Sequence, residues 1–418
     1  MEKCIIVISH SNYRIKSAGI EKFISDTSEQ ITSKGIHILH IFPVIELNKK
    51  LVGEYVGINY DGNFDGIYPE SHIYDDIAEL GIKKKVAFIG VDIHQLHGWD
   101  LRHLEEGLSR LNLPINIFVH DYEMVSAKAL LHDNENTDSS NFQQKHQSQR
   151  YPVSCYGEAN PTRFAEIENF LASISPRVEK VVAPSTIAGK NWCNCFPLFE
   201  GRMVVREHLK CVESLRKEKV AHDGIRIAYL GSKAQHKGYA FWKRLVSSFA
   251  DNDNYTFFYF GKNDSNVLGV QDVHVDFQDP TCPSMTEQLH YQGIDIAFLW
   301  STWQETYCYT YYEAFAAGCF ILTNAQSGNI QFQVQSNKSG VIFQSLEQCI
   351  SYLKDLDQLE KTMLDFHDVC RSFKLNPDIH DLIFENHGKK IYKRTATKHA
   401  YKSIVLSFIY KVLRGDYK

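Results

Sequence analysis

The chain has 418 residues, more than a single hydrophobic core usually supports, so the sequence predicts two domains. Hydrophobic residues make up 44% of it and charged residues 23%, the ordinary balance of a globular enzyme and not of a disordered chain. The formal net charge of −5 argues against a nucleic-acid partner.

Ten cysteines are scattered along the chain without a C-x-x-C pair, which favours a reducing compartment and no disulfide framework. The "CNC" at 193–195 lacks nearby partners, and we do not expect it to bind a metal. The opening apolar run is short, which is typical of a buried strand and not of an export signal. No run reaches the roughly 18 apolar residues of a membrane span. We therefore expect a cytoplasmic protein.

The first half of the chain alternates between apolar runs and amphipathic stretches. Strands are predicted at 4–10, 36–43, 85–92, 115–121 and 180–185, and helices at 19–35 and 101–114. Continuous apolar strands that alternate with helices predict a parallel sheet covered by helices on both faces. The polar stretch 132–150 is predicted to be a long surface loop.

A second series of the same kind begins near residue 224. Strands are predicted at 225–232, 255–262, 295–300, 319–324 and 340–343, and a helix at 238–250. The charged segment 209–224 shows no strand pattern, so we expect the connection between domains there. The predicted domains are 1–210 and 225–385, followed by a basic segment, 386–418. Two doubly wound α/β sheets facing a central cleft would bind ligands at the carboxyl ends of their strands.

Two glutamates, Glu305 and Glu313, stand in "WQETYCYTYYEAFAAGC" (303–319). We expect Glu305 in the loop after the strand at 295–300, with a helix running from Thr306 to Gly318. Eight helical residues rise roughly 12 Å, too far for one metal ion but suited to two distant parts of a long ligand. The amides near Thr306 and Tyr307, at the positive end of this helix, favour an anionic group such as a diphosphate. Taken alone, the spacing also fits two ordinary helix glutamates.

The E-x7-E-A-x-A-x-G pattern, followed by "SGNI" (327–330), resembles the signature of family 4 glycosyltransferases, the retaining enzymes of the GT-B fold. A second segment, "YLGSKAQHKGYAFWKRLV" (229–246), resembles the family's lysine-glycine motif. This resemblance implies that Lys237 binds the leaving diphosphate. The family arginine is replaced by Ser232, and Lys233 stands one residue further on as its nearest substitute.

Three N-terminal segments agree in order with the same family: "SAGIEKFI" (17–24), "HQLHGWDL" (94–101) and "FVHDYEMV" (118–125). The first resembles its glycine loop, with Ala18 at the first glycine and Gly19 at the second, where amides approach donor phosphates or the acceptor. The third implies that His120 contacts the donor sugar.

Three further residues of these segments are weaker candidates on the acceptor side: His94, His97 and Asp121. Each also has a purely structural reading, since buried histidines are often hydrogen-bonded core residues and an aspartate at this place caps a turn.

The resemblance implies retaining transfer of a sugar, of hexosyl type, from a nucleotide-diphosphate donor to an acceptor hydroxyl. Glu305 would bind the sugar and Glu313 the ribose, with Lys237 and Lys233 at the diphosphate. No metal or other cofactor is expected, because two cations and a helix terminus meet the growing charge and no D-x-D triplet stands in a suitable loop. The alternatives are another GT-B activity, an epimerase or a phosphorylase, and a non-catalytic scaffold protein.

The C-terminal 30 residues are strongly basic. They hold Lys389, Lys390, Lys393, Arg394, Lys398, Lys402, Lys411, Arg414 and Lys418, against Asp416 alone. Together with the apolar 403–413 they predict binding to an anionic membrane surface, which suits a lipid-linked or polysaccharide acceptor in surface glycan assembly. The alternative is a helix that packs back on the N-terminal domain, and both readings stay open here.

Overall fold

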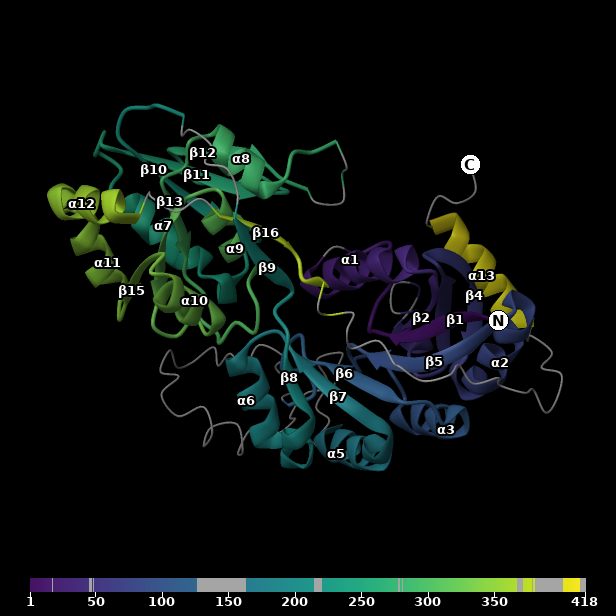
Figure 1. Ribbon diagram of the computed structural model, residues 1–418. Helices are drawn as coiled ribbons and strands as arrows, with labels where there is room; N and C mark the ends of the chain where they lie inside the picture. Colours follow the sequence, from purple (N-terminus) through teal and green to yellow (C-terminus); the bar gives the residue numbers. More distant parts are fainter. Residues whose placement is uncertain are drawn as a thin grey trace. The chain divides into compact units, whose positions relative to one another are not determined.

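The computed structural model describes residues 1–16, 18–44, 47, 49–125, 163–213, 220–276, 279, 281–366, 371–377, 379 and 401–413 (Figure 1). The predicted loop 132–150 lies outside these residues. The described chain falls into two compact units. Unit 1 comprises the described residues of Met1–Ala129, Lys145–Arg206 and Pro377–Lys418, and unit 2 those of Glu207–Asn376.

Unit 1 is built on an eight-stranded sheet of order β4-β3-β2-β1-β5-β6-β7-β8. Its strands are β1 (Glu2–Ile8), β2 (Ile36–Pro43), β3 (Tyr55–Tyr60), β4 (Asn63–Pro69), β5 (Val86–Ile93), β6 (Ile115–Phe118), β7 (Val178–Ala183) and β8 (Met203–Val205). All neighbours are parallel except at one edge, where β3 pairs antiparallel with β2 and β4. The predicted parallel sheet is confirmed, and the edge hairpin is an addition to it.

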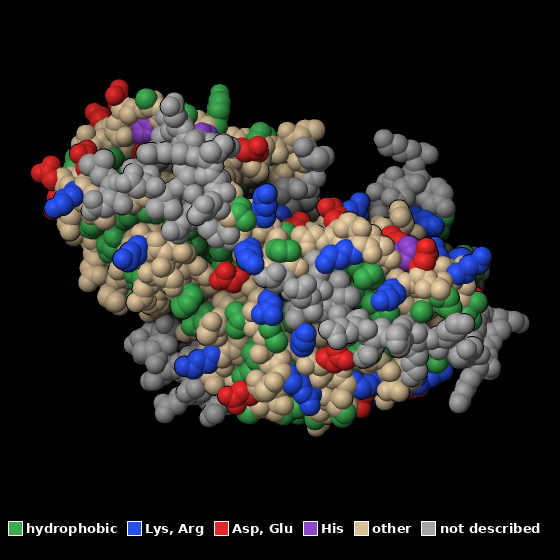
Figure 2. All heavy atoms as spheres, viewed as in Figure 1, with side chains coloured by type: hydrophobic (Ala, Val, Ile, Leu, Met, Phe, Trp, Pro, Cys, Tyr) green, Lys and Arg blue, Asp and Glu red, His purple; other side chains and the backbone are tan. Residues whose placement is uncertain are grey.

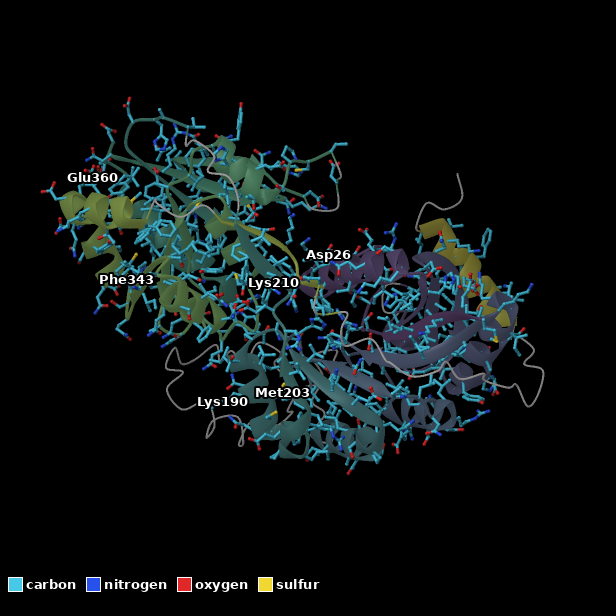
Figure 3. The ribbon with its side chains drawn as sticks, viewed as in Figure 1. Asp26, Lys190, Met203, Lys210, Phe343 and Glu360 are labelled. Carbon is cyan, nitrogen blue, oxygen red and sulfur yellow. The ribbon has the colours of Figure 1, made fainter. Side chains whose placement is uncertain are left out.

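The helices of unit 1 are α1 (Gly19–Ser33), α2 (Ile73–Lys84), α3 (Leu101–Leu111), α5 (Arg163–Ile174), α6 (Thr186–Cys195) and α13 (Tyr401–Leu413). Side-chain hydrogen bonds cap the N-termini of two of these helices. Asp100 accepts a hydrogen bond from the Arg102 amide at the start of α3, and Ser185 accepts one from the Ala188 amide at the start of α6. Met203 of β8, labelled in Figure 3, lies so close to α6 that a Cβ on Gly189 would come within 3.2 Å of its sulfur.

Unit 2 is built on a six-stranded, fully parallel sheet of order β12-β11-β10-β13-β14-β15. The strands are β10 (Ile225–Leu230), β11 (Tyr255–Gly261), β12 (Val270–His274), β13 (Ile296–Leu299), β14 (Phe320–Asn324) and β15 (Gly340–Phe343). In order of appearance this reads 3-2-1-4-5-6, the doubly wound arrangement, whose strand order reverses between β10 and β13.

Helices cover both faces of the unit 2 sheet: α7 (Tyr239–Ser247), α8 (Met285–Tyr291), α9 (Tyr309–Ala316), α10 (Asn329–Asn337), α11 (Leu346–Leu353) and α12 (Leu356–Phe366). Two aromatic cores lie on the opposite faces. Trp242 and Phe298 belong to one, and Phe258 and Tyr311 to the other. The prediction of a sheet enclosed on both sides is confirmed for this unit.

The prediction that 209–224 contains no strand is wrong. Residues Leu209–Glu213 form β9, which pairs antiparallel with β16 (Arg371–Leu375) as a separate two-stranded sheet. A five-residue strand with a lysine and a glutamate carries too weak an alternation to be recognised. The chain passes from unit 1 to unit 2 at Arg206 and Glu207, and the residues after Asn376 belong to unit 1.

Helix α13 packs against β4 of unit 1, one of the two alternatives that the basic tail left open. The Ile67 amide donates a hydrogen bond to the Ser407 hydroxyl at 2.8 Å. Tyr410 is buried beside Phe42 and Phe64, and its hydroxyl accepts a hydrogen bond from the Asn12 amide group at 3.2 Å. None of the described helices is long and apolar enough to cross a membrane.

We expect Tyr410→Ala to lower the free energy of unfolding of unit 1 by about 3 kcal/mol, because it removes a fully buried aromatic ring and leaves a cavity. Thermal denaturation followed by circular dichroism measures the change. Phe408→Ala, two residues away on the exposed side of the same helix, is the control and should leave the melting temperature nearly unchanged. Equal effects of the two substitutions would contradict the described docking of α13.

Candidate active site

The loops after β10 and β13 of unit 2 are brought together by the reversal of strand order between these strands. β10 and β13 are hydrogen-bonded neighbours, so the residues that follow each carboxyl end meet at one edge of the sheet. Lys237 lies in the first loop and Glu305 in the second. This edge is where doubly wound sheets bind their ligands.

Gly238 lets the two loops approach closely. Its φ is +82°, and a Cβ on it would lie 2.0 Å from the Trp300 carbonyl oxygen, so no other residue fits without moving the backbone. The Thr302 amide also donates to the His236 carbonyl at 2.9 Å. The glycine of the predicted lysine-glycine motif therefore holds the first loop against the end of β13.

Lys237 and Glu305 form a tight ion pair. The Lys237 ammonium donates to Glu305 Oε1 at 2.6 Å, and the Ser301 hydroxyl donates to the same oxygen. The Glu305 side chain is 1% exposed, whereas that of Lys237 is 33% exposed. Burial alone would lower the pKa of Lys237, but the facing carboxylate outweighs it and raises the pKa, so the lysine stays charged.

The second carboxylate oxygen of Glu305 is buried and has no hydrogen-bond partner in the described part of the chain. The side chain of Asn329 is in the same condition, with both its amide oxygen and its nitrogen unpaired among the described residues. The Asn329 backbone amide donates to the Glu305 carbonyl at 2.8 Å, so the two residues lie side by side. Unpaired buried polar groups are costly, and their presence here favours a polar ligand that completes them.

Asn329 reaches this position because Gly328 packs on the Glu305 segment. Gly328 has φ +62°, and a Cβ on it would lie 2.6 Å from the Glu305 amide nitrogen. Sequence analysis recognised the "SGNI" segment but assigned no role to Asn329. A glycine before a polar residue at the carboxyl end of a strand was the available signal.

The prediction that a helix begins at Thr306 is wrong, because α9 begins at Tyr309. Cys308 before it is extended, with φ −125° and ψ 97°. Tyr307 instead accepts a hydrogen bond from the Leu209 amide at 3.0 Å and stacks on Tyr312 at 4.6 Å between ring centroids. These tertiary contacts override helix formation at 306–308, so Thr306 and Tyr307 do not supply the first amides of α9.

The remaining donor-side candidates of unit 2 take no part in the Lys237–Glu305 ion pair. Glu313 lies partly buried on α9, so it does not share a helix with Glu305, and the expected rise between them does not apply. Ser232 is exposed. Lys233 donates from its ammonium to the Asp264 carbonyl oxygen at 2.6 Å. Lys233 therefore faces a neutral acceptor, and no carboxylate in the described part of the chain forms an ion pair with it.

In unit 1, His94 at the end of β5 and His120 after β6 form a buried pair. His94 Nδ1 and His120 Nε2 are 2.8 Å apart, so one ring donates to the other. His94 stacks on Phe118 at 4.5 Å, and His120 meets the edge of Phe23 from α1 at 5.0 Å. Burial lowers the pKa of His120 to about 3, which keeps its ring neutral.

Asp121 ties the loops after β5 and β6 together. One oxygen accepts from the Glu123 amide at 2.9 Å, the turn cap that the sequence allowed, and the other accepts from the Gln95 side chain at 2.7 Å. Burial raises the pKa of Asp121 to about 6. His97 is partly buried and packs edge-on against His10 at 6.3 Å.

Ala18 and Gly19 stand at the start of α1. Ala18 is the residue before the helix, with φ −142° and ψ −178°, an extended conformation that any residue adopts. The methyl group of Ala18, where the family carries a glycine, is therefore no conformational obstacle. Gly19 is the exposed first residue of the helix.

Sequence analysis missed a polar cluster at the carboxyl end of β1. The Ser11 hydroxyl donates to Glu21 of α1, and His10 Nε2 lies 3.3 Å from the same carboxylate oxygen. Glu21 is only 2% exposed. The available signal was the "SHS" that closes the first apolar strand. No group of three or more His, Cys, Asp or Glu side chains in the described residues is arranged to hold a metal ion.

Comparison with known proteins gives structural neighbours only. No protein-family model matches the chain, and no curated protein matches it in sequence. Pneumococcal O-GlcNAc transferase GtfA, in complex with UDP and GlcNAc, is similar with a TM-score of 0.53 and 10% identity, over 88% of this chain and 95% of that one.

Two other crystal structures are similar at a TM-score of 0.50. WaaG, a glycosyltransferase involved in lipopolysaccharide biosynthesis, is 10% identical over 87% of this chain and 93% of its own. A glycosyltransferase from Rickettsia africae ESF-5 is 14% identical over 88% of this chain and 94% of its own. Identities this low show the fold alone. The chain has the GT-B fold of two Rossmann-like domains, and the predicted fold class is confirmed.

The buried His120 makes stability depend on pH. Its pKa is about 3 in the folded chain and 6.5 ordinarily, so below pH 6.5 the unfolded chain binds a proton that the folded chain does not. We expect this group to lower the free energy of unfolding by roughly 2 kcal/mol between pH 6.5 and pH 5. The loss should be correspondingly smaller in His120→Gln.

Thermal melts from pH 7 to pH 5 measure this difference. The exposed His72, replaced by Gln, is the control and should keep the wild-type dependence. Asp121, with its raised pKa, acts in the opposite sense in all three proteins and so cancels from the comparison. An identical pH dependence of His120→Gln and wild type would show that His120 is not buried in neutral form.

Proposed function

We propose that this protein is a glycosyltransferase that moves a sugar from a nucleotide-diphosphate donor to an acceptor hydroxyl, with retention at the anomeric carbon. The observation that carries the proposal is the Lys237–Glu305 pair at the β10/β13 reversal of a doubly wound parallel sheet. The unpaired carboxylate oxygen of Glu305 and the unpaired Asn329 side chain support a polar ligand there. The UDP and GlcNAc bound to the structural neighbour GtfA support a nucleotide sugar as that ligand.

Glu305 suits the sugar end of the donor. A carboxylate accepts several hydroxyl groups, and the second oxygen of Glu305 is buried without a partner among the described residues. The Asn329 amide offers both a donor and an acceptor beside it. We therefore assign the hydroxyls of the transferred sugar to Glu305 and Asn329.

Lys237 suits the diphosphate end. An ammonium group carries three donors, and Glu305 engages one of them, so a phosphate oxygen can share the same nitrogen. Lys233 adds a positive charge that no described carboxylate compensates. The exposed Ser232 and the first residue of α1, Gly19, remain in the proposal as weaker donor contacts.

In the transfer step the bond between the anomeric carbon and the diphosphate oxygen breaks, and a bond to the acceptor oxygen forms. Retention places the incoming oxygen on the face from which the diphosphate leaves, so the acceptor proton can pass to the departing oxygen. Charge on that oxygen grows as the bond breaks, and preorganised cations that meet it lower the barrier. Lys237 supplies this stabilisation in the proposal.

Other assignments stay proposals on weaker support. Glu313 of α9 would bind ribose hydroxyls, and the neutral His120 would contact the sugar. His94, His97 and Asp121 would shape the acceptor side. The acceptor would be a lipid-linked or polysaccharide glycan in surface glycan assembly at the cytoplasmic face of a membrane. The neighbour WaaG, a glycosyltransferase involved in lipopolysaccharide biosynthesis, supports this class of acceptor.

A thermal-shift screen against nucleotide sugars identifies the donor, since a ligand that binds only the folded chain raises its melting temperature. The best donor is then incubated with glycan acceptors, and the anomeric configuration of the product is read by NMR. An inverted product rules out retention. Release of a sugar phosphate only in added inorganic phosphate would instead indicate a phosphorylase.

With that donor, we expect Lys237→Ala to lower the rate of transfer by about 100-fold or more, because it removes the cation at the leaving group. Lys243→Ala, an exposed lysine on α7, is the matched control and should retain wild-type activity. Transfer by Lys237→Ala within a few-fold of wild type would refute the role.

Loss of Lys237 also leaves the buried Glu305 carboxylate without its opposite charge, which destabilises the fold. The double variant Lys237→Met with Glu305→Gln removes both charges and should recover much of the melting temperature without recovering transfer. Stability and catalysis are thereby separated.

The proposed transfer uses no metal ion, because cationic side chains meet the leaving group. We expect the rate to stay unchanged when EDTA is added and when Mg²⁺ or Mn²⁺ is restored. A rate that falls at least tenfold with EDTA and recovers with one of these ions would contradict this part of the proposal.

A further inference from the structure

Helix α13 carries two opposite faces, and the described residues of unit 1 cover one of them. Ser403 and Tyr410 are buried against unit 1, and Ser407 is hydrogen-bonded to the Ile67 amide. In Figure 1 the helix is the yellow ribbon beside β4. It is thus a fixed part of unit 1, held by specific contacts along its inner side.

The outer face of α13 is apolar. The exposed fractions of its large side chains are 59% for Ile404, 57% for Phe408, 41% for Ile409, 47% for Val412 and 69% for Leu413. Residues four apart lie on the same side of a helix, so Ile404, Phe408 and Val412 form one row, and Ile409 and Leu413 a second row beside it. A continuous apolar surface of this kind marks an interaction site.

Cations border this apolar face. Lys402 and Lys411 belong to the helix, which contains no acidic residue. Lys83, which is 65% exposed, stands across a groove of about 410 Å³ between α13 and β4, and Ile404, Phe408 and Lys411 line the groove from the helix side. Figure 2 shows further Lys and Arg side chains scattered over the face of unit 1 that it draws.

Two acidic groups near the helix lie beside cations. Asp65, in the groove, lies 3.9 Å from the Lys83 ammonium and 4.0 Å from that of Lys84. Glu54 lies 3.7 Å from the Lys402 ammonium. The sequence after the helix adds Arg414 and Lys418 against Asp416 alone. On the described helix itself the charged side chains are therefore all positive.

We propose that the outer face of α13 docks on the surface of an anionic lipid bilayer. The helix lies in the plane of the interface, its apolar rows enter the headgroup region, and the bordering lysines contact anionic headgroups. The described helix is too short to span a bilayer, because its 13 residues extend only about 20 Å.

A second copy of the chain is a poorer occupant of the same face. In a symmetric dimer the same patch meets itself, so Lys83 and Lys411 would face lysines of the other copy. Anionic headgroups instead compensate those charges. This inference rests on α13 alone and is independent of the proposed sugar transfer.

The test uses the full-length protein and vesicles of phosphatidylcholine, with and without phosphatidylglycerol, in a flotation assay. We expect wild type to float with the phosphatidylglycerol vesicles, less so in high salt, and weakly with phosphatidylcholine alone. The double variant Phe408→Ser with Val412→Ser should bind about tenfold more weakly or worse, because it removes the centre of the apolar face. Lys402→Gln with Lys411→Gln should reduce the preference for anionic lipid.

The matched control is Leu268→Ser with Tyr291→Ser, which removes two side chains of unit 2 that are 98% and 73% exposed. It should float like wild type. All altered side chains are exposed or at the surface, so melting temperatures should stay close to wild type, and transfer to a soluble acceptor should be unchanged.

Three outcomes would overturn the proposal. They are failure to recover wild type with anionic vesicles, flotation of the Phe408/Val412 variant like wild type, and a dimer in light scattering that this variant dissociates. The last result would assign the face to a second copy of the chain. None of these outcomes affects the activity assay, so the two proposals fail separately.

Discussion

The close approach of Gly238 to the carbonyl of Trp300 is the constraint on which the candidate site of unit 2 depends. The parallel strand order makes β10 and β13 neighbours, but neighbouring strands alone leave their loops free to diverge. A glycine at φ +82° brings the first loop onto the end of β13. Lys237 then reaches a carboxylate 68 residues further along the chain.

The resulting ion pair has two consequences that follow from its burial. A carboxylate as deeply buried as Glu305 is tolerated only because Lys237 and Ser301 bind one of its oxygens. The other oxygen is left without a partner, beside an asparagine in the same condition. The site thus holds an ion pair on one side and polar atoms without hydrogen-bond partners on the other. A polar ligand that enters the site and bonds to these atoms would stabilise it. Unit 1 differs, since its buried His94 and His120 are paired with each other and burial lowers the pKa of His120.

Much of this arrangement follows from sequence. Continuous apolar strands and amphipathic helices were sufficient to predict two doubly wound sheets, whereas Lys237 and the role of Glu305 were assigned through the resemblance to family 4 glycosyltransferases. The β3–β4 hairpin was missed although Asp61 and Gly62 at its turn, with φ of +46° and +76°, carry the Asp-Gly signal for such turns. The start of α9 was misplaced because Tyr307 is held by Leu209 and Tyr312, contacts that no local pattern encodes. Asn329 stands in the recognised "SGNI" segment, but no sequence pattern shows that its side chain is buried beside Glu305.

The pairing of β9 with β16 brings the beginning and the end of unit 2 together. The Asn376 amide donates to the His208 carbonyl at 2.9 Å, and the Asn376 side chain donates to the Glu207 carbonyl at 2.8 Å. Unit 2 is therefore an insertion whose two ends are joined by hydrogen bonds. Such a segment can be excised as an autonomous folding module, and a short peptide bridge can close the gap left in its host.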